Sequence, residues 1–489
     1  MNDNKTEVYN ELARIVGKEY VSIDKEDIVP YQRDVVSQAL KLYLADYVVL
    51  PGSVEEVQGI ARVANKYKVP VYPYAAGTNI GGGAVPRKGG IVLVTRRMDQ
   101  IFEINEETMT ATIGPGVTWS KLYYEAAKVG LEPLGVGGGP HSGTAVGNFA
   151  LGGGNTGSMD MNETVSIEVV LPTGELLRTG SAAYMGHEKI NPYCRVAWGP
   201  NITGVFRGSL GAFGIVTKLI RRLYPLREIQ DCVQIGFDNI SDCVFGMSDL
   251  VRLGVSRQIV GIDRAQAAIT SAEPELTANP EEYARHEDSF PGWLVDARNC
   301  CSNEEQANIY RKLIRGVATK HNGTIVEYTG STKRYLDELW GASATVANRY
   351  LRHRPQVMAA AMLPPSMIPE WRRRTLKILD DLDFRPRSFS GRVIEPRVWL
   401  SPWERNESYW FEQNVEFSPT DPVSMEKFRK FQRIFYDEAF KYGAAQIGAT
   451  FMRRAEEQII PTYVKLIRDI KHSLDPNGVF APGQILKDM

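Results

Sequence analysis

The sequence predicts an α+β protein built from two domains. At 489 residues the chain is too long for a single hydrophobic core. Glycine-rich turns between short apolar runs mark the first 225 residues, whereas residues 226–446 are richer in charged and aromatic residues and show long helical patterns. This change in pattern places a domain boundary near residue 225.

The composition excludes several classes of protein. With 43% apolar residues, 24% charged residues and a net charge of −1, the chain has no electrostatic footprint for nucleic acid. The polar opening lacks the apolar core of a signal peptide, and no run is long enough to cross a membrane. The five cysteines are scattered without metal-site spacing and indicate reduced thiols. We therefore expect a cytoplasmic protein with no metal site and no nucleic-acid partner.

The first elements alternate strand, helix and strand. Ser53 and Glu56 form a capping box that opens a helix over residues 54–67, whose apolar positions fall on one face. Strands are predicted before and after this helix, then a hairpin and a second helix that ends at Gly130. The predicted strands of this region are residues 46–51, 69–73, 90–94, 103–106, 108–113, 165–171, 175–179 and 214–220.

Three glycine-rich runs occupy residues 74–83, 137–157 and 208–217. Glycines let the backbone turn through positive φ and point several N–H groups into one concavity, which suits a pyrophosphate. No Lys-Ser/Thr and no long helix follows the first run, which argues against a Walker loop and a dinucleotide fingerprint. A hairpin connection for the first run and a flexible surface loop for the second remain alternatives. The turn-rich second run predicts neither a packed helix nor a long strand.

Six motifs carry a resemblance to a known family. They are Ala76-Gly-Thr-Asn-Ile-Gly-Gly82, Gly114-Pro-Gly116, Val146-Gly-Asn148, Leu171-Pro-Thr-Gly-Glu-Leu176, Gly208-Ser-Leu-Gly-Ala-Phe-Gly-Ile-Val-Thr217 and Asp475-Pro-Asn-Gly-Val-Phe-Ala-Pro-Gly483. In this order they resemble the flavoprotein family of vanillyl-alcohol oxidase and p-cresol methylhydroxylase, which includes the glycolate and D-lactate dehydrogenases. The resemblance implies that the chain binds FAD.

The resemblance also implies an architecture. It places a two-subdomain FAD-binding domain of the p-cresol methylhydroxylase (PCMH) type at residues 1–225 and an antiparallel-sheet substrate cap at residues 226–446. Residues 447–489 would return to the first domain. We call residues 1–225 and 447–489 the flavin half, and residues 226–446 the cap. The elements predicted from residue 226 onward are strands at 232–237, 259–262, 387–400 and 408–417, and helices at 304–319, 425–442 and 461–474. The phenylalanine stripe of the helix at 425–442 is predicted to be core.

The resemblance assigns the glycine-rich runs to the cofactor. The implied FAD-binding residues are Tyr74, Ala75, Ala76, Gly77, Thr78, Asn79, Ile80, Gly81, Pro140, His141, Ser142, Thr144, Gly147, Asn148, Gly152, Gly211, Gly214 and Ile215. His141 is the nearest counterpart of an acidic residue that the family's alcohol oxidases carry beside the flavin. Its imidazole could accept a proton from a substrate hydroxyl as hydride leaves. The alternative is that His141 only hydrogen-bonds a phosphate or a backbone carbonyl.

In the family, the strand at 408–417 roofs the flavin and carries the covalent attachment of some members. Trp410 or Phe411 falls at that position, and neither can form the bond, so we expect non-covalent FAD. Alternation separates a face with Tyr409 from a face with Glu412 and Asn414. Tyr409 and Glu412 are further catalytic candidates, and Asn414 could bind the substrate. The alternative is that the polar face is solvated.

Two departures limit what the resemblance implies. The paired-histidine segments of the family's 2-hydroxyacid dehydrogenases are absent, and the cap histidines lack metal-site spacing. Ala445 and Gln446 align where phenol-oxidising members place a Tyr-Arg pair; Gln446 is a substrate-binding candidate. Arg352 could hold a carboxylate or could lie in an exposed basic turn. The run 371–374 is expected to form a solvated helix face.

The predicted activity is that of an FAD-dependent oxidoreductase. It would take a hydride from a CH–OH group or a benzylic carbon of a small alcohol-type substrate, aromatic ones included, onto flavin N5. A D-2-hydroxyacid dehydrogenase is one alternative, and a flavin-binding electron-transfer subunit of a larger complex is another. Oxygen or an electron-transfer protein would be the acceptor. We expect a homodimer or a higher homo-oligomer.

Overall fold

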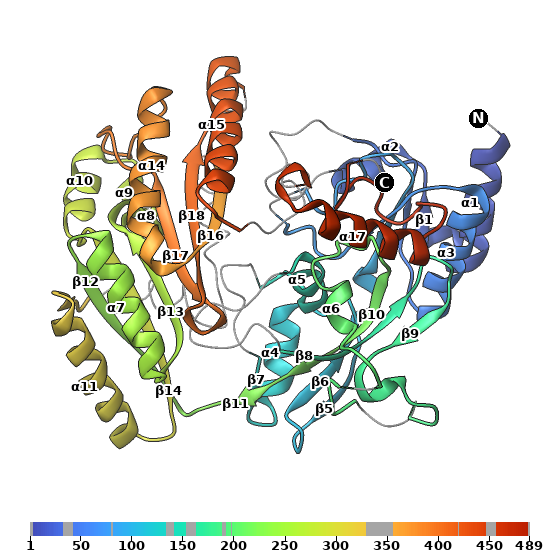
Figure 1. The fold of residues 1–489 in the computed structure, drawn as a ribbon, viewed down its shortest axis with the longest axis horizontal. Helices are drawn as coiled ribbons and strands as arrows, with labels where there is room; N and C mark the ends of the chain where they lie inside the picture. The colour runs from blue at the N-terminus through green and yellow to red at the C-terminus, as the bar shows by residue number, and fades with distance from the viewer. Residues whose placement is uncertain are drawn as a thin grey trace.

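The structure is a computed structural model of the chain. It describes residues 3–32, 43–79, 82–133, 141–152, 163–187, 192–196, 198–328, 356–418, 420–445 and 456–487. Figure 1 shows two parts side by side, with the cap on the left and the flavin half on the right. The dark red helix α17 (Pro461–Leu474) lies on the flavin half, although it follows the cap in sequence.

The flavin half contains two main sheets among its described residues. One is four-stranded with the order β1-β2-β4-β3, and the other is five-stranded with the order β5-β6-β10-β8-β9. The strands are β1 Val21–Ser22, β2 Tyr47–Val49, β3 Val71–Tyr74, β4 Ile91–Val94, β5 Ile101–Asn105, β6 Thr110–Ile113, β7 Leu131–Glu132, β8 Thr164–Val170, β9 Leu176–Arg178, β10 Ile215–Arg222 and β11 Tyr224–Pro225. The helices are α1 Asp3–Val16, α2 Lys25–Ile28, α3 Val54–Tyr67, α4 Trp119–Ala127, α5 Ala145–Leu151 and α6 Thr203–Phe206.

Helix α3 matches the sequence prediction at both ends. The Ser53 hydroxyl accepts a hydrogen bond from the Glu56 N–H at 3.2 Å, as a capping residue should. The buried side of the helix, which includes Val57 and Ile60, joins the core beneath the parallel strands β2, β3 and β4. This core fixes β3, the strand that leads into the first glycine-rich run.

The second run contains a helix that the sequence analysis did not predict. Helix α5 forms because the Thr144 hydroxyl caps its start, accepting from the Gly147 N–H at 3.0 Å, and Gly152 ends it with φ +83°. Its apolar residues, including Val146 and Phe149, pack into the core of the five-stranded sheet. The many glycines of this run made it difficult to recognise the short amphipathic helix and the two residues that cap its ends.

The cap is built on an antiparallel sheet with the order β15-β12-β14-β13-β17-β18-β16. Its strands are β12 Ile229–Phe237, β13 Ser256–Asp263, β14 Trp293–Cys301, β15 Thr324–Ile325, β16 Gln356–Leu363, β17 Arg397–Trp403 and β18 Ser408–Glu416. Its helices are α7 Ile240–Leu253, α8 Arg264–Ser271, α9 Pro274–Thr277, α10 Pro280–Asp288, α11 Glu304–Lys320, α14 Ile368–Asp381 and α15 Pro422–Lys441.

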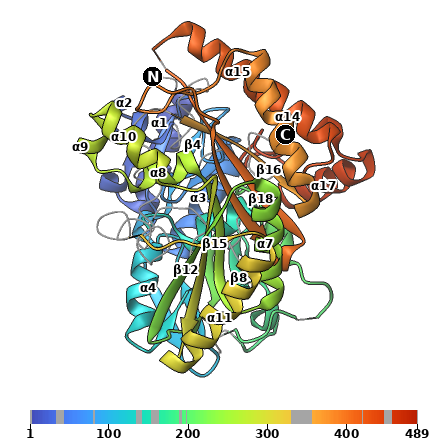
Figure 2. The ribbon, with the colours of Figure 1, turned by 90° about the vertical axis from the view of Figure 1, so that its left-hand side faces the viewer.

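The two faces of the cap sheet are covered differently. Residues of α7, α11, α14 and α15 form one large core with the first face, and Figure 2 shows α7 and α11 in front of the strands. Phe428, Phe431 and Phe435 of α15 are buried, which confirms the predicted stripe. Helices α8 and α10 cover part of the opposite face. Strands β16 and β18 are the cap strands nearest the flavin half in Figure 1.

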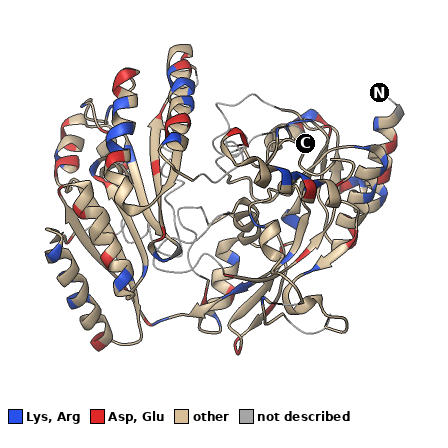
Figure 3. Ribbon diagram, viewed as in Figure 1, with Lys and Arg blue, Asp and Glu red and all other residues tan. Residues whose placement is uncertain are grey.

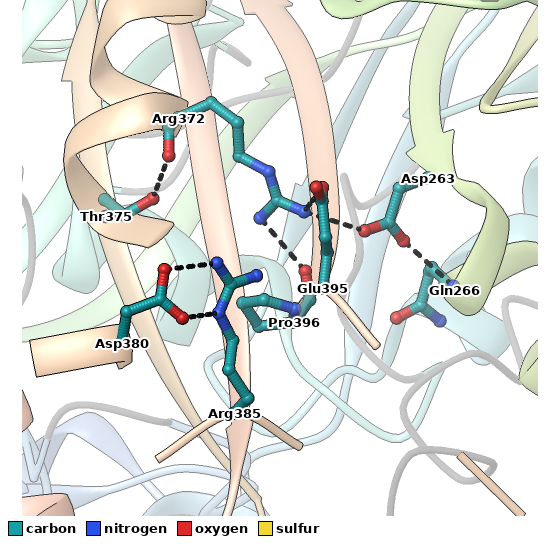
Figure 4. A network of polar contacts seen from close by, with 8 residues as sticks. All are labelled: Asp263, Gln266, Arg372, Thr375, Asp380, Arg385, Glu395 and Pro396. Atoms are coloured by element: carbon teal, nitrogen blue, oxygen red, sulfur yellow. Dashed lines mark hydrogen bonds and ion pairs between the residues drawn. The ribbon is translucent and has the colours of Figure 1, made fainter. Parts of the chain in front are cut away.

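One run of the cap departs from its predicted exposure. The run 371–374 lies on α14, where Trp371 and Arg372 are buried rather than solvated. The Arg372 guanidinium donates to the Pro396 carbonyl at 3.0 Å and pairs with Glu395 at 2.8 Å and Asp263 at 3.4 Å (Figure 4). One arginine of this charged run, Arg372, is therefore buried, and its contacts connect α14 to the end of β13.

Polar contacts join the two parts where the chain crosses between them. Arg257 of β13 in the cap binds the Glu132 carboxylate and the Pro225 carbonyl, which belong to the paired strands β7 and β11 of the flavin half. The boundaries predicted at residues 225 and 446 stay predictions.

Basic and acidic residues are interspersed over both parts (Figure 3). Among the described residues, none of the helices is both long enough and apolar enough to cross a membrane.

Candidate active site

Three glycine-rich segments from distant parts of the sequence meet beside β3. The first follows β3 directly, where Gly77 has φ +69° and a Cβ added to it would lie 1.9 Å from the Tyr74 hydroxyl. Asn79 closes the turn by accepting a hydrogen bond from the Gly83 N–H at 3.1 Å. Only glycine fits at residue 77, because a side chain there would collide with the tyrosine in a strained backbone.

The second segment lies against the first. A Cβ on Gly147 would lie 3.4 Å from the Cβ of Ala75 and 2.9 Å from the Thr144 hydroxyl. The start of α5 therefore packs closely on the turn after β3. Thr144 is buried in its capping role, Asn148 is half-buried, and Ser142 is exposed.

The third segment closes the group. Gly208 and Leu210 donate their N–H groups to the carbonyls of Phe149 and Ala150 at 3.2 and 3.0 Å. Gly211 has φ +82°, and a Cβ there would lie 2.3 Å from Cγ of Pro73 in β3. The third segment thus contacts both the first and the second.

The end of the third segment leads into the five-stranded sheet. A Cβ on Gly214 would lie 2.4 Å from Cγ1 of Val169, so this glycine allows close packing on β8. Ile215 is buried and pairs with Val170 at the start of β10. The predicted contact of the Ile215 backbone with adenine stays a prediction.

This arrangement fits an FAD pyrophosphate. Three turns with small residues converge, and the glycines allow a backbone approach that side chains would block. Of the predicted cofactor residues, Tyr74 to Asn79, His141 to Gly152 and Gly211 to Ile215 fall within this group. Ile80, Gly81 and Pro140 lie outside the described residues.

His141 is held by its backbone at the entrance to the second segment. Its carbonyl accepts hydrogen bonds from the N–H of Ser120 at 3.2 Å and from the Ser120 hydroxyl at 3.4 Å. The side chain is half-buried, and this burial lowers the pKa of His141 below its usual value. The imidazole is therefore neutral near pH 7 and able to accept a proton.

The cap supplies a second candidate base on β18. Glu412 is half-buried and accepts hydrogen bonds from the Trp410 indole N–H at 3.0 Å and the Asn414 amide at 3.1 Å. Burial raises the pKa of Glu412, and the two hydrogen bonds oppose that shift. Trp403 stacks on Trp410 with ring centroids 5.4 Å apart, so an indole pair borders the carboxylate.

Tyr409 lies on the other face of β18, as alternation predicts. It is fully buried in the cap core, and its hydroxyl contacts the Ser248 hydroxyl at 3.1 Å and the Val244 carbonyl at 3.4 Å. Burial raises the pKa of Tyr409 well above its usual range. A tyrosine packed under α7 is not positioned to meet a substrate, so its placement argues against a catalytic role. Arg352 and Gln446, the other substrate candidates, lie outside the described residues.

Residues 471–484 contact β3 and the third segment, and these contacts were not predicted from the sequence. Lys471 and Asp475 are four residues apart at the end of α17, a spacing that brings side chains together on a helix. This spacing, just before the Asp475-Pro-Asn-Gly motif, was the available signal.

A family model matches the part of the chain that contains the first two glycine-rich segments. The family model described as an FAD binding domain matches residues 45–180. The probable mitochondrial D-lactate dehydrogenase of Danio rerio is 24% identical over 98% of this chain and 92% of its own. The flavoprotein subunit of the hydroxylating 4-cresol dehydrogenase of Pseudomonas putida is 24% identical over 96% and 93%. The glycolate oxidase subunit GlcD of Bacillus subtilis is 28% identical, and this match spans half of each chain.

Solved structures share the fold over the whole chain. The structure of p-cresol methylhydroxylase with substrate bound superposes with a TM-score of 0.85 at 19% identity, covering 99% of this chain and 97% of that one. A 4-ethylphenol oxidase from Gulosibacter chungangensis, in complex with isoeugenol, gives a TM-score of 0.84 at 22% identity with the same coverage.

Proposed function

Because the chain belongs to the FAD-linked oxidoreductases and FAD is its cofactor, we propose that it removes a hydride from a small alcohol-type or benzylic substrate. The observation that carries the proposal is the convergence of three glycine-rich segments beside β3, in a chain whose cap carries a carboxylate beside an indole pair. When bound, FAD supplies an isoalloxazine ring that accepts a hydride. The chain's own residues then have to bind the substrate and move a proton.

His141 is the proposed base. Its fixed backbone and neutral imidazole support a role in accepting the proton of a substrate hydroxyl. Glu412 is the candidate in the cap, because burial raises its pKa above that of an ordinary glutamate and Asn414 orients its carboxylate. In this proposal the two residues would approach the substrate from different halves of the molecule.

The face of the cap sheet that carries Glu412 favours aromatic substrates. Trp410 beside Glu412 is half-buried and stacks on the buried Trp403, and Trp399, directly opposite Glu412 on β17, is buried under α8 and α10. Flat rings pack well on indole surfaces. The relative that acts on 4-cresol supports the same class.

A D-2-hydroxyacid dehydrogenase is the second candidate, favoured by the D-lactate dehydrogenases among the relatives. Such a substrate needs a cation for its carboxylate. Arg397 on the same face is buried and already pairs with Glu416 at 3.0 Å, which counts against this alternative. A flavin-binding electron-transfer subunit is the third candidate, because two relatives are named as subunits.

A substrate panel separates these candidates. Aromatic alcohols, alkylphenols and D-2-hydroxyacids are mixed anaerobically with the protein, and bleaching of the flavin absorbance is followed. We expect an aromatic alcohol or alkylphenol to bleach the flavin fastest. Bleaching by hydroxyacids alone would establish the second candidate, and a flavin that no member of the panel reduces would favour the electron-transfer subunit.

The attachment of FAD has its own test. Neither Trp410 nor Phe411 can form a flavin bond, so acid or heat should release FAD into the supernatant. Flavin that remains with the precipitated chain would contradict non-covalent binding.

A further inference from the structure

Lys471 is a buried cation at the end of α17. Its ammonium group donates to the Ala212 carbonyl at 2.8 Å, to the Phe480 carbonyl at 2.6 Å and to the Asp475 carboxylate. The residue is 3% exposed and its partner Asp475 is 1% exposed. An ammonium has three N–H donors, and all three are used here within the protein. Lys471 therefore acts on its surroundings through these partners.

Asp475 carries the contact into the segment that follows. Its carboxylate accepts hydrogen bonds from the N–H groups of Val479 at 3.1 Å and Phe480 at 2.8 Å. These bonds hold a tight turn, after which the chain pairs with β3. The N–H of Val71 donates to the Val479 carbonyl, and the N–H of Ala481 donates to the Val71 carbonyl, both at 2.7 Å.

The same segment also contacts residues that follow the first glycine-rich run. The Tyr72 hydroxyl donates to the Pro482 carbonyl at 3.0 Å and accepts from the Lys88 N–H at 3.0 Å. The buried Gln484 amide donates to the Val85 carbonyl at 2.8 Å. Residues 471–484 thus contact the strand before the first run and the turn after it.

The hydrogen bond from Lys471 to Ala212 connects the third glycine-rich segment to these contacts. Ala212 follows Gly211, the residue that packs on Pro73 of β3. Through Ala212, Asp475 and Phe480, Lys471 connects the third segment to the chain that covers β3. A buried ammonium group therefore adds to the packing of Gly211 on Pro73 in holding the third segment against the chain that pairs with β3.

We propose that Lys471 is a positioning residue for FAD, which holds the first and third cofactor segments at the spacing that the cofactor requires. The inference rests on the proposed function only in taking these segments as the cofactor site. Without Lys471 the third segment loses its hydrogen bond at Ala212 and its link to Phe480, so its position relative to the first segment is less well defined and FAD has to order it when it binds. That ordering weakens cofactor binding while the rest of the fold remains.

The test measures FAD affinity of the apoprotein, independently of any substrate. FAD is removed, and the fluorescence of added FAD is titrated well below the melting temperature. Lys471→Met should raise the Kd by about tenfold or more, a change equivalent to roughly 1.4 kcal/mol. Tyr72→Phe, which removes one hydroxyl and keeps the fold, should raise it by about threefold, roughly 0.6 kcal/mol.

Arg372→Met is the matched control. Arg372 is an equally buried and paired cation, but it lies in the cap. The Arg372→Met substitution should lower the melting temperature of the apoprotein and leave the Kd for FAD within about twofold of the wild type. If Lys471→Met fails to fold, Tyr72→Phe decides. A Kd unchanged by Lys471→Met, a Kd unchanged by Tyr72→Phe where the lysine variant does not fold, or an equal loss in Arg372→Met would overturn the proposal.

The outcome is separable from that of the proposed function. A wild-type protein that binds FAD but is reduced by no substrate would remove the proposed activity and leave the Kd comparison intact. A Kd unchanged by Lys471→Met in a protein that oxidises its substrate would remove the positioning role alone.

Discussion

The flavin half and the cap use different parts of the polypeptide at their functional positions. In the flavin half the decisive atoms belong to the backbone, because Gly211 packs on Pro73 of β3 where a side chain would collide and Gly77 turns at φ +69°. In the cap the decisive atoms belong to side chains, such as Glu412 and Trp410 on one face of β18. A site built from the backbone requires glycines, which can be recognised in the sequence. A site built from side chains depends on which strands become neighbours, and this cannot be seen in the sequence. Changes in the flavin half should therefore abolish cofactor binding, and changes in the cap should alter the reaction.

The largest expected effect is that of Gly211→Val. The variant should be purified without flavin, because valine disfavours φ +82° and its Cβ would lie 2.3 Å from Pro73. Flavin absorbance per protein gives the measurement. Gly204→Val is the matched control, since a Cβ at Gly204 meets nothing within 4 Å, and it should keep its flavin. A yellow Gly211→Val protein would contradict the assignment of this segment to the cofactor.

His141→Ala should have the next largest effect. If His141 accepts the substrate proton, the variant keeps FAD, and its reduction by substrate slows by about 10²–10⁴-fold. Rapid mixing under anaerobic conditions measures this step independently of the electron acceptor. Reduction at the wild-type rate would indicate that the catalytic base is a residue of the cap. Weaker FAD retention with normal reduction would instead indicate an anchoring role.

Glu412→Gln tests the cap side of the comparison. Its pKa is raised by burial, so Glu412 gains a proton at a higher pH than an ordinary glutamate and cannot then act as a base. The reduction rate of the wild type should fall as pH decreases through this raised pKa. The variant should be slower by about tenfold at neutral pH and should lose that acidic limb, with FAD affinity unchanged. An unchanged pH profile would exclude Glu412 from the proton transfer.

The smallest effect concerns the stability of the cap. Burial raises the pKa of Asp263 to about 7, although the Arg372 guanidinium opposes the shift. Because the folded state holds this proton more tightly than the unfolded state, the stabilising contribution is complete below about pH 4 and is lost as pH rises to about 7. Asp263→Asn removes this dependence. Its melting temperature relative to the wild type should increase by a few degrees from about pH 5 to about pH 8. A constant difference would show that Asp263 stays ionised.

Much of the flavin half could be predicted from its sequence. The capping box at Ser53 marked the start of α3, and glycine at residues 77, 147 and 211 indicated where the backbone had to turn or pack closely. Helix α5 was missed because its caps stand among glycines, and glycine-rich composition outweighed a seven-residue apolar pattern.

The cap was less predictable because its contacts join residues distant in the sequence. Alternation placed Tyr409 and Glu412 on opposite faces of β18, but it could not show that α7 covers the first of them. Arg372 looked solvated because two exposed arginines follow it, whereas its partner Asp263 lies 109 residues away. A charge run gives no indication of a partner at that distance.

The pairing of β3 with residues 479–481 also determines when the molecule can be completed. Gln484 and Val85 are separated by 399 residues, and the whole cap lies between them. A ribosome therefore makes the cap before it makes the chain that covers β3. Domains usually fold in the order of their synthesis, but here the flavin half has to wait for residues 471–484. On the role proposed for Lys471, FAD capture is a late step of biogenesis, and until then the nascent chain exposes the edge of β3 that residues 479–481 later cover.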